Sequence, residues 1–319
     1  MMLVNRTTGS IRHEMFSNLP EYFKRGDVLV INDSKVIPAK LIGQRKTGGL
    51  IEILLLAKIV ESAPNNSVWE AMLKPSRRIR IGDKLLFNSH CKAVIDARIS
   101  DKKWRIVFTS KTNFDDFLNN YGRTPLPPYI KRKKTVTTED DDRERYQTVY
   151  AKIPGSVAAP TAGLHFSHHM LDLLKKKEVL IAPVTLHVGH GTFAPIETDL
   201  VEDHRMHEES FEISKNTADA INEAENVIAV GTTSARVIES VADETGRVKA
   251  TSSRTDLFIY PGYRFKRINA LLTNFHLPKS SLFLLVCSFA GRDLIRKAYQ
   301  QAIENDYRFY SYGDCMLIL

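Results

Sequence analysis

The feature that most restricts the possible folds of this chain is residues 45–110, a stretch without any helix-length pattern. Five or six short segments there alternate apolar and polar residues, and Gly, Asn, Asp and Ser separate them. The clearest segments read GLIEILLLAK, VWEAMLK, RRIRIGDKLLF, CKAVIDARI and KWRIVFTS. Short strands at regular spacing with turn residues between them are typical of a small antiparallel barrel or sandwich. We therefore predict a compact all-β unit in this part of the chain.

The segments on either side have a different pattern, in which helical and strand-like runs alternate. Before the stretch, Phe16–Asp27 has apolar residues at helical spacing, and Val28–Asn32 is a short apolar strand. After it, we expect helices at His168–Lys177, Lys215–Glu225, Ser234–Asp243 and Leu294–Asn305, and strands at Val179–Val184, Val227–Val230, Leu257–Tyr260 and Leu282–Cys287. This alternation is typical of an α/β domain with a mostly parallel sheet. We predict one discontinuous α/β domain, residues 1–44 and 146–319, with a barrel-like domain inserted at 45–145.

Composition and charge exclude several classes of protein. The three cysteines share no close spacing, which argues against a disulfide framework or a Cys-based zinc site. The longest apolar run, Leu282–Ala290, is far shorter than the roughly 20 residues that a membrane span needs. The start, MMLVNRTTG, lacks the pattern of a signal peptide. We expect a cytoplasmic protein without a membrane segment.

The chain has a basic surplus. It holds 45 Lys and Arg against 37 Asp and Glu, a formal net charge of +8. Such a surplus favours a polyanionic partner, because basic side chains that neutralise phosphates release counterions. A basic enzyme that binds no nucleic acid has the same composition, so charge alone leaves both interpretations open.

Eight of the ten histidines lie between His165 and His276, which concentrates acid–base capacity in the α/β domain. His187 follows a strand in TLHVGHGTF, and the glycines around it allow a ligand to approach the backbone closely. In HRMHEE, His204 and His207 would share one face of a helix and suit a metal, although the zincin spacing is absent. A metal-dependent hydrolase therefore stays open as an alternative.

Three further segments carry chemistry. In VIAVGTTSARVIES an apolar strand ends at Gly231, and a helix begins with Thr232 and Thr233. The free amides at the start of this helix favour binding of an anion. Alternatively, the two threonines serve only as helix caps. GSVAAPTAGLHF is rich in small residues and exposes backbone amides, unless it is only a structural loop. NFHLPKSSLFLLV places His276 just before an expected buried strand, at the edge where open α/β sheets bind ligands.

Together with NDSKVIPAKL, PLPPYI, RYQTVYA, TLHVGHGTF, HRMHEE, TDLFIYPGYRF and the terminal YRFYSYGDCMLI, these segments resemble the bacterial S-adenosylmethionine:tRNA ribosyltransferase-isomerases of queuosine biosynthesis. The match runs in order through nearly the whole chain, and a block such as GSVAAPTAGLHF is highly specific. The family fold, an α/β domain with an inserted β-barrel, agrees with the pattern above. Two departures stand out. The family normally begins about two dozen residues earlier, whereas MMLVNRTTGSIRH starts inside the first strand, which indicates either a truncated start or a degenerate member. His190 stands where the family usually has a small residue.

The resemblance implies that S-adenosylmethionine serves as a substrate, a ribosyl donor, with no further cofactor. The acceptor would be 7-aminomethyl-7-deazaguanine at the wobble position of a tRNA, and the products epoxyqueuosine, adenine and methionine. The sulfonium acidifies the adjacent 5′ carbon, so the site needs a base, an acid for adenine, a dry cavity and an anion hole for the methionine carboxylate. We expect the protein to be a monomer. A non-catalytic tRNA-binding protein is a second alternative function, beside the metal-dependent hydrolase.

Residue type and position within the motifs supply candidates for each of these roles. Proton transfer is expected of His165, His187 and His276, with Glu208 as orienting carboxylate or alternative base. Thr232 and Thr233 would hold a carboxylate or phosphate, Asp256 and Tyr260 would face the nucleoside or sulfonium, and Asp33 and Lys35 would line the same cavity. The residues expected to meet tRNA are Arg123, Lys131, Arg132 and Arg236.

Overall fold

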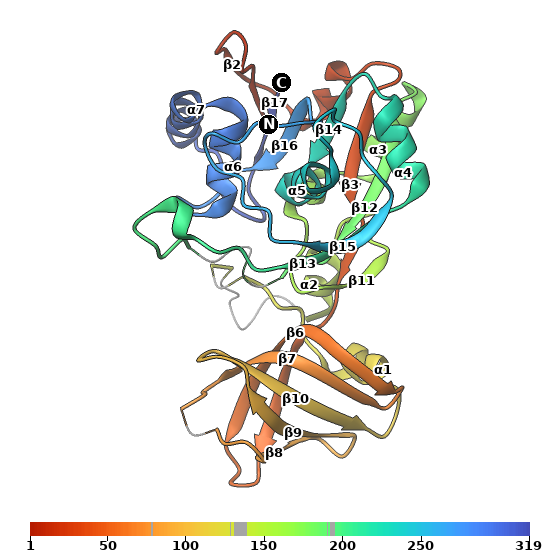
Figure 1. The fold of residues 1–319 in the computed structure, drawn as a ribbon, viewed down its shortest axis with the longest axis vertical. Helices are drawn as coiled ribbons and strands as arrows, with labels where there is room; N and C mark the ends of the chain where they lie inside the picture. Colours follow the sequence, from red (N-terminus) through yellow and green to blue (C-terminus); the bar gives the residue numbers. More distant parts are fainter. Residues whose placement is uncertain (78, 128, 131–138, 190, 192–194) are drawn as a thin grey trace. The chain divides into compact units, whose positions relative to one another are not determined.

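The computed structural model describes residues 1–77, 79–127, 129–130, 139–189, 191 and 195–319. The chain forms two compact units, which Figure 1 shows in colours that follow the sequence. The larger comprises Met1–Ser34, Thr148–Ile153 and Ala159–Leu319, and the smaller comprises Lys35–Gln147 and Pro154–Ala158. The two units are defined by contacts between residues and not as independently folding domains. The predicted domain limits at 44/45 and 145/146 therefore stay a prediction.

The smaller unit is a closed barrel of six antiparallel strands in the order β10-β7-β6-β5-β8-β9. The strands are β5 (Lys40–Arg45), β6 (Leu50–Ala63), β7 (Asn66–Lys74), β8 (Lys84–Phe87), β9 (Cys91–Arg98) and β10 (Lys103–Ser110). Alternate side chains of β7, β9 and β10 are buried, as the alternating pattern requires of a barrel interior. Helix α1 (Phe114–Tyr121) adds its own apolar side chains to this core, and its N-cap Asn113 accepts hydrogen bonds from the first-turn amides.

The larger unit is built on a nine-stranded sheet in the order β15-β13-β12-β3-β14-β16-β17-β1-β2. Its strands are β1 (Met2–Val4), β2 (Ile11–His13), β3 (Val28–Asn32), β12 (Leu180–Leu186), β13 (Glu209–Ile213), β14 (Val227–Val230), β15 (Thr251–Thr255), β16 (Ala270–Asn274) and β17 (Cys315–Ile318). The centre, β12-β3-β14-β16, is parallel, but the flanking pairs are antiparallel except β1 with β17. The sheet is therefore mixed and not mostly parallel as predicted. Strands β4 (Ser34–Val36) and β11 (Ile153–Ser156) form a separate two-stranded sheet.

Helices cover both faces of the parallel centre. The larger unit contains helices α3 (His168–Lys176), α4 (Lys215–Glu223), α5 (Gly231–Val241), α6 (Ser281–Ala290) and α7 (Arg292–Glu304), with short 3₁₀ segments η1 (Phe16–Tyr22), η2 (Thr161–His165) and η4 (Val201–Asp203). Helix α2 (Glu139–Arg145) belongs to the smaller unit. Leu174 of α3 packs with Leu29 and Ile31 of β3 on one face. Val30 points to the opposite face, since side chains alternate along a strand, and α5 contacts β3, β12, β14 and β16. The prediction of an α/β domain with an inserted antiparallel barrel is confirmed.

Some element predictions are wrong. Leu282–Cys287 was predicted as a strand but lies inside helix α6. The prediction failed because a short run of apolar residues has the same pattern in a buried strand and in a buried helix. Leu257–Tyr260 belongs to no strand, since β15 ends at Thr255. Phe16–Asp27 contains only the 3₁₀ segment η1, in which Pro20 removes a backbone donor. Val28–Asn32 and Val227–Val230 are confirmed as strands.

Candidate functional site

A pocket lies in the larger unit at the carboxyl ends of parallel strands β12, β14 and β16. Its empty volume is about 330 Å³ when the open solvent at the mouth is included. The residues that line it are Ala159, Pro160, Thr161, Ala162, Val188, Gly231, Thr232, Thr233, Thr273, Asn274, His276 and Leu282. This is the sheet edge at which open α/β folds bind ligands, as predicted for the segment that contains His276.

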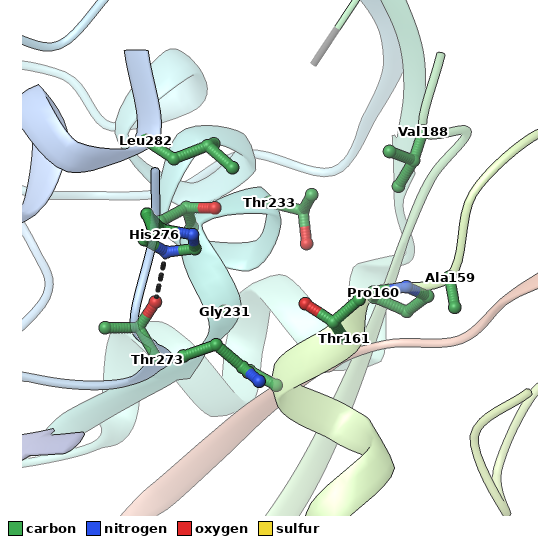
Figure 2. A pocket seen from close by; sticks show the side chains of 12 residues that line it. Ala159, Pro160, Thr161, Val188, Gly231, Thr233, Thr273, His276 and Leu282 are labelled. Carbon is green, nitrogen blue, oxygen red and sulfur yellow. Dashed lines mark hydrogen bonds between the residues drawn. The ribbon is translucent and has the colours of Figure 1, made fainter. Parts of the chain in front are cut away.

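The amino terminus of helix α5 forms one wall of this pocket. Gly231 begins the helix with φ +84°, a conformation that side chains other than hydrogen disfavour. No side chain caps the helix, so its first amides are not used by a capping group. Thr233 is buried, and within the described residues its hydroxyl has no hydrogen-bond partner. In Figure 2 the Thr233 side chain lies between His276 and Val188. Free amides, the helix dipole and an unpaired hydroxyl together suit an anion.

His276 lines the pocket on the side away from Val188 in Figure 2. Its Nε2 is 2.8 Å from the Thr273 hydroxyl, the dashed line in Figure 2, and its backbone amide donates to the Tyr299 hydroxyl at 2.8 Å. The side chain is 9% exposed. Burial lowers the pKa of His276 from 6.5 to about 4, so the imidazole is neutral at pH 7. A neutral imidazole at a pocket wall is able to accept a proton.

A second buried imidazole, His165, ends the 3₁₀ segment η2, whose first residues line the pocket. Its Nε2 is buried and has no hydrogen-bond partner of ordinary length among the described residues. Burial lowers the pKa of His165 to about 4, and the neighbouring side chain of Asn274 acts in the opposite direction. Asn274 lines the pocket, and its Oδ1 likewise lacks a partner in the described part of the chain. The structure thus brings His165, Asn274 and His276 to one side of the pocket.

His187 and Asp33 lie in a second group of polar side chains beside this pocket. Thr185 donates a 2.6 Å hydrogen bond to Asp33, yet burial raises the pKa of that carboxyl. Burial lowers the pKa of His187, whereas the charges of Asp33 and Glu212 act in the opposite direction. His187 immediately precedes the pocket-lining Val188, and its Nδ1 is buried without a partner among the described residues. This group is therefore available for proton transfer.

Three predicted site residues of the larger unit, Glu208, Asp256 and Tyr260, belong neither to the pocket lining nor to the groups beside it. Glu208 is exposed and pairs with Arg254 at 2.9 Å, also on the surface. Asp256 is exposed in the segment after β15, and Tyr260 is half-buried against the ring of Phe258. Their predicted roles at the nucleoside, sulfonium or base stay predictions.

The predicted tRNA contact of Arg236 requires correction. Arg236 lies on α5, is 2% exposed and pairs with Glu209, itself 4% exposed. A guanidinium enclosed in this way cannot reach an RNA phosphate. Arg123 is exposed in the barrel unit, as is Lys35. Lys131, Arg132 and His190 lie outside the described residues.

Two buried groups were missed by the sequence analysis. Tyr150 is one: its hydroxyl is buried without a partner among the described residues, and burial together with the Asp33 charge raises its pKa. Glu209 is the other, although the alternation of ESFEI offered a signal. Glu209 shares a strand face with Phe211 and Ile213, so Glu209 and not Glu208 is the inward carboxylate.

The histidine cluster does not form a metal centre in the part of the chain that the structure describes. No group of three or more His, Cys, Asp or Glu side chains there could hold a metal ion. His204 and His207 were predicted to share one face of a helix, but they lie after η4 in a segment without helical structure. Within the same described residues, no helix combines the length and apolar character needed to cross a membrane.

Comparison with known proteins places these features in context. Residues 1–318 match a family described as queuosine biosynthesis protein. A protein of Syntrophus aciditrophicus named S-adenosylmethionine:tRNA ribosyltransferase-isomerase is 57% identical over 334 residues, covering 100% of this chain and 92% of the relative. A protein of the same name from Caldanaerobacter subterraneus subsp. tengcongensis is 47% identical with the same coverage. The crystal structure of an S-adenosylmethionine tRNA ribosyltransferase from Thermotoga maritima is similar with a TM-score of 0.52 and 32% identity, covering 100% of this chain and 91% of that one.

Proposed function

We propose a reaction for this chain from one premise, that it belongs to the family of queuosine biosynthesis proteins. It is an enzyme that transfers the ribosyl moiety of S-adenosylmethionine to tRNA and isomerises it. The metal-dependent hydrolase and the non-catalytic tRNA-binding protein receive no support from the relatives. S-adenosylmethionine is consumed as a substrate, and we propose that no further cofactor takes part.

The acceptor we propose is 7-aminomethyl-7-deazaguanine at the wobble position of a tRNA anticodon, and the product is epoxyqueuosine. A base removes a proton from the 5′ carbon beside the sulfonium and leaves an ylide. Adenine departs from the anomeric carbon and takes up a proton from an acid, and the acceptor amine adds there and loses a proton. The nitrogen lone pair then breaks the bond between the anomeric carbon and the ring oxygen, which leaves an alkoxide on the 4′ carbon. The ylide electron pair forms the bond between the 5′ and anomeric carbons, and the alkoxide displaces methionine from the 5′ carbon to form the epoxide. Each step needs water excluded from the ylide, which an enclosed pocket provides.

The amino terminus of α5 is our proposed site for the methionine carboxylate. Hydrogen-bond donors face this pocket from the helix terminus: the first backbone amides of α5 and the hydroxyl of Thr233. Thr232 also lines the pocket. Asn274 Oδ1, an acceptor without a partner among the described residues, suits the ammonium of the same amino acid. The donor sulfur and the 5′ carbon would then lie between this wall and His276.

Proton transfer is assigned to the neutral imidazoles. His276 lines the pocket and His165 lies behind Asn274, so these two are our first candidates for the base at the 5′ carbon and the acid at adenine. His187 with Asp33 is the alternative pair. Arg123, Lys131 and Arg132 are proposed to contact tRNA, and Lys35, Asp256, Tyr260 and Glu208 keep supporting roles in the proposal. We also propose that the enzyme works as a cytoplasmic monomer.

The observation that carries this proposal is the pocket itself, which joins an uncapped helix terminus to buried, neutral histidines. The test supplies S-adenosylmethionine and tRNA bearing the deazaguanine, and measures free adenine and methionine by liquid chromatography and mass spectrometry. Equimolar release of both is expected. Binding of tRNA without either product would contradict the enzymatic proposal.

Substitution Thr233→Val tests the carboxylate site. It removes the hydroxyl at nearly constant volume, and a hydrogen bond to a charged group contributes about 1.5–3 kcal/mol. We therefore expect the KM for S-adenosylmethionine to rise by about 10- to 100-fold, with little change in the KM for tRNA. Thr245→Val, at an exposed threonine that bonds only within its own turn, is the matched control. An unchanged KM in Thr233→Val would remove the carboxylate from this helix.

A further inference from the structure

An ion pair lies fully inside the larger unit, between strand β13 and helix α5. Arg236 Nη1 donates to Glu209 Oε2, and each of these two side chains is 3% exposed. Neither residue lines the pocket, and the proposed reaction does not use them. A buried ion pair stabilises a fold little compared with apolar residues of similar size. Stability alone therefore does not explain why this ion pair is buried at this position.

Other atoms of the pair bond to two further segments of the chain. Glu209 Oε1 accepts a 2.8 Å hydrogen bond from the amide of Gly189, in the loop that follows β12. Arg236 Nε donates a 3.1 Å hydrogen bond to the carbonyl of Leu257, in the segment between β15 and Tyr260. The pair thus joins the loop after β12, helix α5 and the segment after β15 at one point.

The bond to Gly189 has a specific consequence for the pocket. The Ser210 carbonyl accepts from the His187 amide at 3.0 Å, and the Glu209 side chain accepts from the Gly189 amide. Val188, which lines the pocket, is thereby held on both sides by consecutive residues of β13. Arg236 holds the same carboxylate from α5, one helical turn after Thr232 and Thr233.

We propose that Glu209 and Arg236 are a positioning pair that sets the spacing between the Val188 wall and the amino terminus of α5, and so fixes the site for the amino-acid end of the donor. This inference rests on the proposed function. A carboxylate that accepts simultaneously from a loop amide and a helix guanidinium transmits the position of one wall to the other. Misplacement by about 1 Å at such a site costs roughly 10²-fold in rate.

Two double variants test the proposal without leaving an unpaired buried charge. Glu209→Leu/Arg236→Met removes every bond of the pair, whereas Glu209→Gln/Arg236→Met keeps an oxygen that accepts from Gly189. Neither variant keeps the guanidinium that links the carboxylate to α5, so we expect the KM for S-adenosylmethionine to rise by about 10- to 100-fold in both. The KM for tRNA is expected to stay unchanged, and calorimetric titration of S-adenosylmethionine alone should show the same loss of affinity. Glu225→Gln, which breaks the exposed pair with Lys24, is the control and should match the wild type.

The outcomes separate the two proposals. If the wild-type protein releases neither adenine nor methionine, the proposed function fails. If it does, and either double variant has wild-type kinetics, only the positioning proposal is overturned. Should the first variant not fold, Gly189→Pro removes the same amide donor and Gly189→Ala keeps it, with the new Cβ at an ordinary 3.7 Å from Glu209 Oε1. A higher KM in Gly189→Pro than in Gly189→Ala is then expected, and equal values overturn the proposal.

Discussion

Gly163 lies in η2, next to the pocket-lining Ala162, and packs too closely against its neighbours to allow a side chain. A Cβ at this position would lie 2.1 Å from the Tyr150 hydroxyl and 2.7 Å from Thr148 Cγ2. Because both neighbours belong to the packed interior, Gly163→Ala forces them to shift. We expect a loss of about 1–3 kcal/mol in the free energy of unfolding, measured by urea denaturation. Gly49→Ala, whose Cβ would meet no atom closer than 4.0 Å, is the control, and equal stability of the two variants would contradict the prediction.

Single residues also show where sequence reasoning reaches its limit. Thr232, Thr233 and His276 were assigned to a ligand site from strand ends and a helix start, and all three line the pocket. Glu208 was predicted as a site carboxylate, but the alternation of strand β13 buries its neighbour Glu209 and leaves Glu208 on the surface. The burial of Arg236 follows from a partner 27 residues away, which no local pattern reveals.

Among the elements, helix α6 depends on its first residues. The Ser280 hydroxyl oxygen accepts from the Phe283 amide at 3.2 Å, and the hydroxyl donates to the Leu277 carbonyl at 2.7 Å. Ser280→Ala removes this cap and should lower the free energy of unfolding by about 1 kcal/mol in urea denaturation. Ser280→Thr keeps both groups and should retain most of the stability. A loss as large in the Thr variant would show that the site depends on size and not on capping.

The same helix explains why one element was assigned wrongly. SLFLLVCSFA is apolar almost all round, because α6 is buried on most sides, so it carries little helical periodicity. The barrel strands have one buried and one exposed face, and their alternation was therefore visible in the sequence. Pattern reasoning succeeds where an element meets water on one side and fails where it meets protein on both.

At the scale of the whole molecule, the candidate site combines distant parts of the chain. Its lining residues run from Ala159 to Leu282 and meet because parallel strands β12, β14 and β16 end at one edge. The α/β alternation predicted that edge, and it could not predict the strand order that brings η2 beside β16. The mixed sheet has the same origin, since the antiparallel returns of β13, β15 and β17 depend on contacts distant in sequence.

The acid stability of the whole molecule follows from its buried histidines. Burial lowers the folded-state pKa values of His276 and His165 from 6.5 to about 4. Between pH 6.5 and 4 the unfolded chain binds protons at these positions that the folded chain does not bind, so stability falls as pH falls through this window, and the contribution is complete above it. Each shifted histidine accounts for about 2 kcal/mol between pH 7 and pH 5.

His276→Gln tests this directly. Glutamine does not titrate, so the difference in unfolding free energy between pH 7 and pH 5 should shrink by about 2 kcal/mol relative to the wild type, measured by urea denaturation at each pH. His169→Gln, at an exposed position of α3, is the control and should leave the difference unchanged. Because all other titrating groups are common to the three proteins, their contributions cancel in the comparison. An unaltered pH dependence in His276→Gln would mean that the pKa of His276 is the same in the folded and the unfolded chain, so burial would not be what keeps this imidazole neutral.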